Sequence, residues 1–258
     1  MSMSRLSALV VAATLVACAP VPLAGAQSRA LVVGSSATYP PFAYETPTKQ
    51  IVGFDVDIIT AVAKKSGLAV RLVNTPFTGV FASLNNGDID IIISGVTIND
   101  RRQQSYDFTA PYFEARQLMA VPAASTVKTL QDLAGKKVAV VTGSTADDVA
   151  SRAFGKTSAN IRRFDTTPLI IAELTAYGVE AAIGDNGVIA YRVQEQKGLK
   201  TVADPSFPKE YFGIVVKQGN TALKDKLNAG LAGIISDGTY ARLYRQWFKA
   251  EPPVLPKP

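Results

Sequence analysis

Two residue types, histidine and cysteine, limit the chemistry that this chain can perform. Its 258 residues include no histidine, and the only cysteine, Cys18, lies near the N-terminus. A Ser–His–Asp triad, a Cys–His pair and any histidine metal site are therefore excluded. Carboxylate, arginine, lysine, tyrosine, serine and threonine side chains remain, and we expect neither a metal ion nor a cofactor.

Two stretches of the chain repeat one pattern that ends in a polar side chain. A predicted helix is followed by a glycine, an acidic residue and an apolar strand, which ends at Ser94 in one case and at Asp185 in the other. Ligands of open α/β sheets bind at the carboxyl ends of strands, so the repeat predicts two similar lobes with a site between them. Asp185 could instead cap the helix that begins at Asn186.

Two further groups could bind an anion. Ser144 and Thr145 open a predicted helix, whose N-terminus favours negative charge. Arg101 and Arg102 form a basic pair, and a guanidinium can bind a carboxylate through two parallel hydrogen bonds. Each group also has an ordinary structural explanation: Ser144 suits a helix N-cap, and Arg101 and Arg102 could form a solvated surface pair.

The elements that must position these side chains alternate along the chain. Short β-branched runs and helical stretches follow one another, which predicts an α/β fold with largely parallel sheets. Asp55 and Thr167 are interpreted as helix caps. The expected strands are 31–33, 89–94, 137–142, 179–184 and 212–216, and the expected helices are 55–65, 81–86, one from 145, 167–177, 186–197, 221–235 and 239–248.

The ends of the chain have their own patterns. Residues 1–26 predict a signal peptide, with Arg5, an apolar stretch and Ala24-Gly25-Ala26 as the cleavage site. The run Leu15-Val16-Ala17-Cys18 also looks like a lipobox, which would leave Cys18 lipidated. Either route exports the protein, and we expect it in the periplasm. The four prolines of residues 251–258 predict a disordered tail.

The charged residues indicate no nucleic-acid partner. Lysine and arginine total 27 against 21 acidic residues, and the basic residues are spread out as single residues and pairs. Nucleic-acid binding would favour a basic stripe or face, and the sequence has none. We expect a monomer with a solvated basic surface.

A series of motifs runs in order through nearly the whole exported chain. Together they resemble the family-3 solute-binding proteins of bacterial amino-acid ABC importers. The motifs are Tyr39-Pro40-Pro41-Phe42, Gly53-Phe54-Asp55-Val56-Asp57-Ile58, Ile93-Ser94-Gly95-Val96-Thr97, Arg101-Arg102, Ser105-Tyr106-Asp107-Phe108, Pro111-Tyr112-Phe113, Gly143-Ser144-Thr145, Asp185-Asn186 and Gln246-Trp247-Phe248.

The resemblance implies the two-lobe periplasmic binding protein fold (type II), which closes on a free amino acid and delivers it to the permease of an ABC transporter. Lobe 1 would comprise residues 27–115 and 212–250, and lobe 2 residues 116–211. The hinge strands would lie near residues 115–121 and 203–213.

The resemblance also implies a role for each site residue. Arg102 would bind the α-carboxylate, and Asp185 would bind the α-ammonium. The other ligand-binding positions are Ser94, Gly95 and Thr97 from lobe 1, Ser144 and Thr145 from lobe 2, and the rings of Tyr39 and Phe77 against the ligand side chain.

Ser36 is the expected specificity residue. Relatives that bind basic amino acids usually carry an acidic residue at this position, and a buried ligand cation without a counter-charge costs several kcal/mol. The ligand is therefore expected to be a polar amino acid, either basic or glutamine-like.

Two other functions use the same fold. Cyclohexadienyl dehydratases have a catalytic glutamate where this chain has Val188, so the elimination would lack its proton donor and we expect no enzyme activity. A ligand-sensing domain would use the same site and would normally be fused to a membrane segment.

Overall fold

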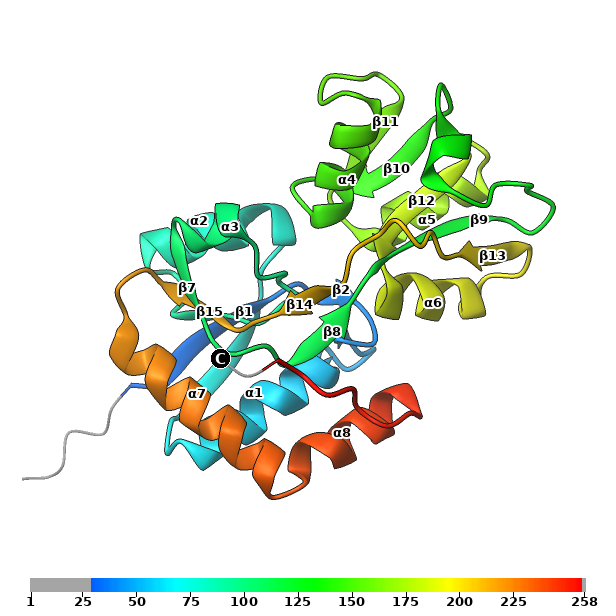
Figure 1. Cartoon of the computed structure of the whole chain (residues 1–258). Coiled ribbons are helices and arrows are strands. Elements are labelled where there is room, and N and C mark those ends of the chain that lie inside the picture. Colours follow the sequence, from blue (N-terminus) through cyan, green and yellow to red (C-terminus); the bar gives the residue numbers. More distant parts are fainter. Residues whose placement is uncertain (1–28, 257–258) are drawn as a thin grey trace, which may run out of the picture.

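The computed structural model describes residues 29–256, so the predicted signal peptide and Cys18 lie outside the described part of the chain. Figure 1 shows two lobes, one at the lower left and one at the upper right, joined by strands that cross between them. Each lobe is built on a five-stranded sheet. The predicted two-lobe α/β fold is confirmed.

The sheet of lobe 1 consists of β1 (Leu31–Ser35), β5 (Val70–Asn74), β6 (Ile91–Ile92), β7 (Tyr106–Phe108) and β15 (Val215–Lys217). Its strand order is β5-β1-β6-β15-β7. β1 is parallel to both β5 and β6, whereas β15 is antiparallel to β6 and to β7. The carboxyl ends of the parallel strands therefore meet along one edge.

Helices cover both faces of this sheet. α1 (Phe54–Lys65), α7 (Thr221–Ser236) and α8 (Thr239–Phe248) lie on one face, and α2 (Phe77–Asn86) on the other. α1 forms because apolar residues recur at helical spacing, with acids in its first turn and lysines in its last, where each charge complements the helix dipole. The short helix α3 (Asp100–Gln103) follows the sheet edge, and a small sheet holds β2 (Thr38–Tyr39), β3 (Ala43–Glu45) and β4 (Ile51–Val52).

Lobe 2 has the same plan. Its strands β9 (Gln117–Pro122), β10 (Val138–Val141), β11 (Ile161–Phe164), β12 (Ala181–Asp185) and β13 (Leu199–Val202) have the order β11-β10-β12-β9-β13. The parallel strands are β10, β11 and β12. α4 (Thr145–Phe154) packs on one face, and α5 (Thr167–Thr175) and α6 (Asn186–Glu195) pack on the other, with a 3-10 turn at Leu130–Leu133.

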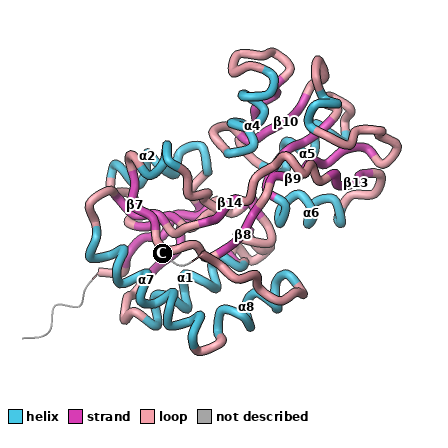
Figure 2. Tube along the Cα trace, viewed as in Figure 1, coloured by secondary structure: helices cyan, strands magenta, loops and turns pink. Residues whose placement is uncertain are grey.

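The lobes are connected by a pair of antiparallel strands. β8 (Phe113–Ala115) leads into lobe 2 and β14 (Glu210–Phe212) leads back, and the two strands pair with each other between the lobes. Figure 2 shows that irregular segments link these strands to their neighbours in each lobe. β14 ends at Phe212 and β15 begins at Val215, so the predicted single strand 212–216 is two strands.

Several predicted boundaries differ from the structure. α2 begins at Phe77 instead of residue 81, and only Ile91–Ile92 of the expected strand 89–94 is paired. The N-cap of α5 is Thr166, which makes Thr167 the first helical residue. Asp55 is inside α1 and caps nothing, because Gly53 is the N-cap residue.

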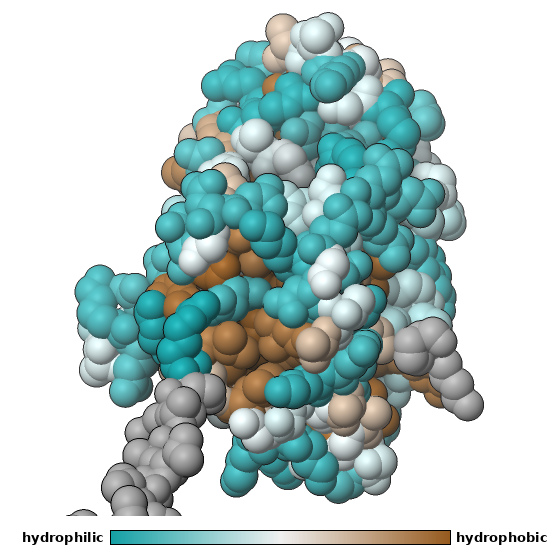
Figure 3. All heavy atoms as spheres, turned by 90° about the vertical axis from the view of Figure 1, so that its left-hand side faces the viewer, coloured by the Kyte–Doolittle hydropathy of each residue, from teal (hydrophilic) through white to brown (hydrophobic). Residues whose placement is uncertain are grey.

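The surface in Figure 3 is mostly hydrophilic, with hydrophobic residues gathered in one patch in its lower half. No helix within residues 29–256 is long and apolar enough to cross a membrane. Of the C-terminal tail, residues 251–256 form neither helix nor strand, and Leu255 packs against the core of lobe 1.

Candidate ligand-binding site

A pocket lies where the carboxyl ends of the parallel strands of both lobes meet. Ser36 follows β1 and Ser94 follows β6, whereas Ser144 follows β10 and Asp185 ends β12. This is the position that ligands take in open α/β sheets. All ten residues predicted from the sequence line this one pocket: Ser36, Tyr39, Phe77, Ser94, Gly95, Thr97, Arg102, Ser144, Thr145 and Asp185.

Arg102 is held on the lobe 1 side of the pocket. Its Nη1 donates to the Thr97 carbonyl at 2.9 Å, and its guanidinium stacks near the rings of Phe77 and Phe81, 5.8 and 5.5 Å from their centroids. The side chain is only 6% exposed. Burial and the positive charge of the neighbouring Arg101 together lower the pKa of Arg102 to about 10, so the group stays charged at neutral pH.

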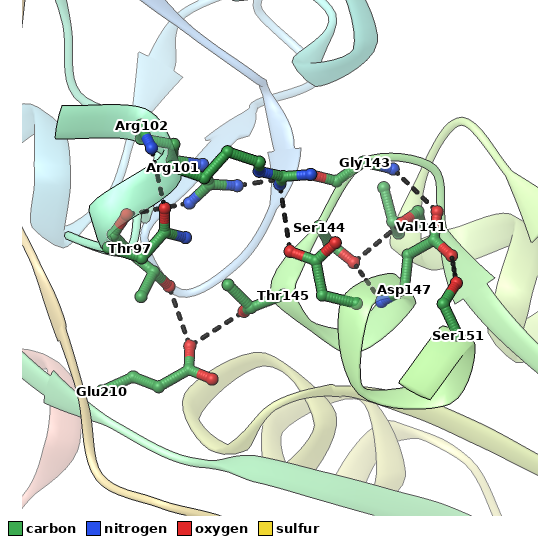
Figure 4. Close-up of polar contacts among 12 residues, drawn as sticks. Thr97, Arg101, Arg102, Val141, Gly143, Ser144, Thr145, Asp147, Ser151 and Glu210 are labelled. Carbon is green, nitrogen blue, oxygen red and sulfur yellow. Dashed lines mark hydrogen bonds and ion pairs between the residues drawn. The ribbon is translucent and has the colours of Figure 1, made fainter. Parts of the chain in front are cut away.

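Across the cleft, Arg102 also reaches lobe 2. Its Nη2 donates to the Gly143 carbonyl at 3.3 Å (Figure 4). A guanidinium has five N–H donors. The contacts to Thr97 and Gly143 use two of them, so donors remain for a ligand carboxylate.

Asp185 forms the acidic side of the pocket. The hydroxyl of Tyr39 donates to its Oδ2 from lobe 1, and Nε2 of Gln117 donates to its Oδ1 at 2.8 Å. Burial and the negative charge of Glu210 together raise the pKa of Asp185 to about 6. The predicted alternative of a helix cap is wrong, because the Asp185 side chain makes no capping hydrogen bond to α6.

Ser144 and Thr145 form the N-terminus of α4. The Ser144 hydroxyl accepts a hydrogen bond from the Asp147 amide and donates to the Val141 carbonyl, so its side chain serves as a helix cap. The first amides of a helix have no partner within the helix. Here these amides belong to Thr145 and Ala146, which both line the pocket.

Asp55 supports the pocket from behind. It is fully buried, and its carboxylate accepts hydrogen bonds from the Gly95 amide and the Tyr112 hydroxyl, both at 2.9 Å. Gly95 has a φ of +56°, and a Cβ there would lie 2.7 Å from the Tyr39 ring. Glycine is therefore required at this position, where the backbone turns under the ring.

Ser36 and Ser94 connect two loops on the lobe 1 side of the pocket. The Ser36 amide donates to the Ser94 hydroxyl at 3.0 Å, and the Ser36 hydroxyl lies 3.3 Å from that of Thr38. Phe77 lines the pocket and also packs against the core beside α2. Phe77 is therefore a pocket residue, as predicted, and a core residue as well.

The sequence analysis missed three acidic or amide side chains. Gln117 is 2% exposed and lies directly opposite Asp185 in the pairing of β9 with β12. Glu210, at the start of β14, accepts from the Thr97 and Thr145 hydroxyls at 2.9 and 2.8 Å. Asp165 follows β11 and lines the pocket. A single acid or amide in a loop carries no motif, so only the strand pairing reveals these positions.

An ion pair spans the cleft outside the pocket. Arg101 Nη2 lies 3.0 Å from a carboxylate oxygen of Asp148 on α4. Arg101 is 60% exposed. Arg101 and Arg102 therefore do not form one solvated surface pair. Arg101 bridges the lobes at the surface, and Arg102 lines the pocket.

Among residues 29–256, no group of three or more metal-ligating side chains could hold a metal ion. The pocket instead combines the buried guanidinium of Arg102 on lobe 1 with the acidic side chains of Asp165 and Asp185 on lobe 2, together with backbone amides and hydroxyls. This arrangement can bind a small ligand that carries both an anionic and a cationic group.

The chain is similar to proteins that are named for the amino acids that they bind. The probable histidine-binding protein of Neisseria gonorrhoeae is 39% identical over 222 residues, which covers 85% of this chain and 83% of that protein. The crystal structure of ArtJ, the arginine-, lysine-, histidine-binding protein of Geobacillus stearothermophilus, superposes with a TM-score of 0.84 and 41% identity, covering 87% of this chain and 97% of ArtJ.

A third similar structure bears on the enzyme alternative. It is an ancestral amino acid-binding protein, a precursor of cyclohexadienyl dehydratase, with a TM-score of 0.76 and 33% identity, covering 85% of this chain and 95% of that one. The family model of the bacterial extracellular solute-binding proteins, family 3, matches residues 31–250. The chain belongs to this family.

Proposed function

We propose that this chain is an extracytoplasmic binding protein that captures a free polar amino acid and delivers it to the permease of an ABC importer. The observation that carries the proposal is the placement of Arg102 on lobe 1 and Asp185 on lobe 2 in one pocket. An amino-acid zwitterion needs an anion receptor and a cation receptor at a fixed separation, and these two side chains supply both.

The carboxylate pole consists of Arg102 and the amides of Thr145 and Ala146. The guanidinium binds the α-carboxylate through two hydrogen bonds, and the N-terminus of α4 adds the positive end of its dipole. The sequence analysis assigned Ser144 to this pole. Its hydroxyl is occupied by the helix cap, so its contribution is to present the next two amides.

The ammonium pole consists of Asp185, Gln117, Thr97 and Glu210. Asp185 accepts hydrogen bonds from the α-ammonium in place of the one from Tyr39. The sequence analysis predicted Thr97 as a ligand-binding residue of lobe 1. Because its hydroxyl donates to Glu210, its lone pairs are left for the pocket, and these suit an ammonium.

The charge of the pocket favours a basic side chain. Of the described residues, those with acidic or basic side chains that line the pocket are Arg102, Asp165 and Asp185. A zwitterion neutralises Arg102 and Asp185 and leaves Asp165 at the edge. Asp165 makes no hydrogen bond or ion pair with another described residue, so it can meet a distal ligand cation in place of the acid missing at Ser36. A glutamine-like side chain remains the alternative.

Ligand binding acts by favouring the closed arrangement of the lobes. Arg102 belongs to lobe 1, whereas Asp185 and the amides of α4 belong to lobe 2, so one ligand contacts them all only when the lobes meet. The free energy of those added contacts shifts the population toward the closed form. The permease then binds the closed surface.

The comparisons support binding without catalysis. ArtJ and the Neisseria relative are named as binding proteins. Val188, where a dehydratase would carry its acid, is 1% exposed and packs in the apolar core, so no proton donor stands there. Export by the predicted N-terminal signal peptide agrees with the description of the family as extracellular solute-binding proteins.

A thermal-shift screen tests the proposal. The chain from residue 27 is unfolded and refolded to remove carried ligand, then heated with each of the twenty amino acids. A ligand at 1,000 times its Kd adds roughly 4 kcal/mol, or roughly 8–15 °C in Tm. Stabilisation by arginine, lysine or histidine supports Asp165 as the partner of a distal ligand cation. Stabilisation by glutamine alone would indicate that Ser36 determines which side chain is bound. No stabilisation by any amino acid contradicts the proposal.

A further inference from the structure

Glu210 connects both lobes from a position behind the pocket. Its Oε2 accepts hydrogen bonds from the Thr97 hydroxyl of lobe 1 at 2.9 Å and from the Thr145 hydroxyl of lobe 2 at 2.8 Å. Figure 4 shows both hydroxyls converging on this one oxygen. Glu210 itself is at the first residue of β14, the strand that returns between the lobes.

The two threonines separate Glu210 from the ligand. Thr97 and Thr145 line both the ligand pocket and an outer groove, and Glu210 lines the groove. Within residues 29–256, Glu210 is not among the residues that line the pocket. Any effect of its carboxylate on a ligand must therefore act through the hydroxyls or through the field of its charge.

The direction of these hydrogen bonds is fixed by chemistry. A carboxylate accepts hydrogen bonds and donates none, and a hydroxyl has a single hydrogen to donate. Thr97 and Thr145 must therefore point their hydrogens at Glu210. Thr145 also accepts from Gln117 Nε2 at 3.0 Å, and Thr97 is left with lone pairs toward the pocket. A ligand group next to Thr97 must be a hydrogen-bond donor.

Gln117 joins Glu210 to Asp185. Its Nε2 lies 2.8 Å from Asp185 Oδ1 and 3.3 Å from Glu210 Oε2. One amide thus contacts two carboxylates, and its nitrogen must face them because its carbonyl oxygen would be repelled. The two acids place two negative charges around one side of the pocket, and Arg102 is the only basic residue among its described lining residues.

We infer that Glu210 is the positioning residue of the ammonium pole: it orients the Thr97 hydroxyl as an acceptor toward the pocket, binds the Thr145 hydroxyl of lobe 2, and supplies a second negative charge that selects a ligand with an α-ammonium group. The inference rests on the proposed function. It gives a role to a hinge-strand residue that makes no ligand contact. Because Thr145 comes from lobe 2, the full arrangement exists only when the lobes are closed.

The test compares ligands that differ at one group. L-Arginine and L-glutamine are each titrated by calorimetry against the refolded protein, beside the matching α-hydroxy acids, in which a hydroxyl replaces the α-ammonium. Glu210→Gln keeps the shape and a carbonyl acceptor and removes the charge. We expect it to weaken amino-acid binding about tenfold and α-hydroxy-acid binding less than about twofold.

Two further variants keep the test independent of folding defects. Thr97→Val removes the oriented hydroxyl at nearly constant volume and should give the same selective loss of amino-acid affinity. Combining it with Glu210→Gln should lower that affinity little further. Glu114→Gln is the matched control: Glu114 is on the partner strand β8, and its carboxylate pairs with the surface residue Lys209. It should leave both affinities unchanged. The Tm of each variant reports its folding.

The possible results distinguish a failure of this inference from a failure of the proposed function. Equal weakening of the amino acid and the α-hydroxy acid by Glu210→Gln, or no weakening of either, would overturn the role of Glu210 and leave the proposed function intact. Failure of the unaltered protein to bind any amino acid would overturn both.

Discussion

The two poles of the pocket are built in different ways. Arg102 takes its main support from lobe 1 alone: the Thr97 carbonyl, the Asn99 side chain that accepts from its backbone amide, and the rings of Phe77 and Phe81. Asp185 of lobe 2 is completed by Tyr39 from lobe 1 and by Gln117, with Glu210 of the connecting strand behind it.

The difference indicates an order of events. In the proposed mechanism Arg102, which takes its main support from lobe 1, is in place before closure, so the α-carboxylate can bind it in an open molecule, and the α4 amides of lobe 2 join on closure. The ammonium pole assembles from three parts of the chain and is complete only on closure. Contacts at the first pole should therefore set whether a ligand binds, and contacts at the second should set how long it stays.

The largest expected effect is at the preformed pole. Arg102→Lys should cost about 3–5 kcal/mol of binding free energy, because an ammonium cannot reproduce the two parallel hydrogen bonds of the guanidinium. Calorimetry with the amino acid that stabilises the refolded protein best measures it. Near-native affinity of this variant would show that Arg102 does not bind the carboxylate.

At the assembled pole, Asp185→Asn should weaken binding by about 2–5 kcal/mol, mainly through faster dissociation. The pKa of Asp185 is about 6 without ligand, and an α-ammonium binds the ionised form. Affinity should therefore fall as the pH drops below 6, by up to about tenfold per unit, and the variant should lose this dependence. Asp148→Asn, which makes the same acid-to-amide change at the surface ion pair, is the control for stopped-flow and calorimetry.

Behind both poles, Asp55 should make stability depend on pH. Burial raises the pKa of Asp55 to about 7, against its ordinary value of 3.8 in the unfolded chain. As the pH rises from 4 to 7, the unfolded state ionises while the folded state keeps the proton, so folding becomes less favourable. We expect urea unfolding to give about 2 kcal/mol less stability at pH 8 than at pH 5. Asp55→Asn should reduce this slope, and an unchanged slope would contradict the assignment.

The smallest effect is expected at the edge of the cleft. Arg101→Ala removes an exposed ion pair between the lobes and should cost no more than about 1 kcal/mol of binding free energy. This variant is also a control for Arg102→Lys, because it alters the adjacent arginine. A loss at Arg101 as large as that at Arg102 would mean that lobe contact, and not recognition of the carboxylate, dominates affinity.

The motifs predicted the fold and eight of the ten pocket residues, because residues such as Ser94, Ser144 and Asp185 follow or end strands and the sheet topology gathers those ends at one edge. They missed Gln117 and Glu210 because these residues join the site only through pairing between distant strands. The direction of the Thr97 hydroxyl depends on Glu210, 113 residues away, so its role could not be read from local sequence. Asp55 was misassigned since an acid at a helix start ordinarily caps it.

The central claim is that one ligand must present both an α-carboxylate and an α-ammonium to opposite lobes. Calorimetric titration of the refolded protein with L-arginine and with agmatine, which is arginine without its carboxylate, tests it most directly; L-glutamine and its decarboxylated form serve if arginine does not bind. We predict that removing the carboxylate weakens binding at least about 100-fold, as loss of a buried ion pair requires. Equal affinity for the two compounds would contradict the account.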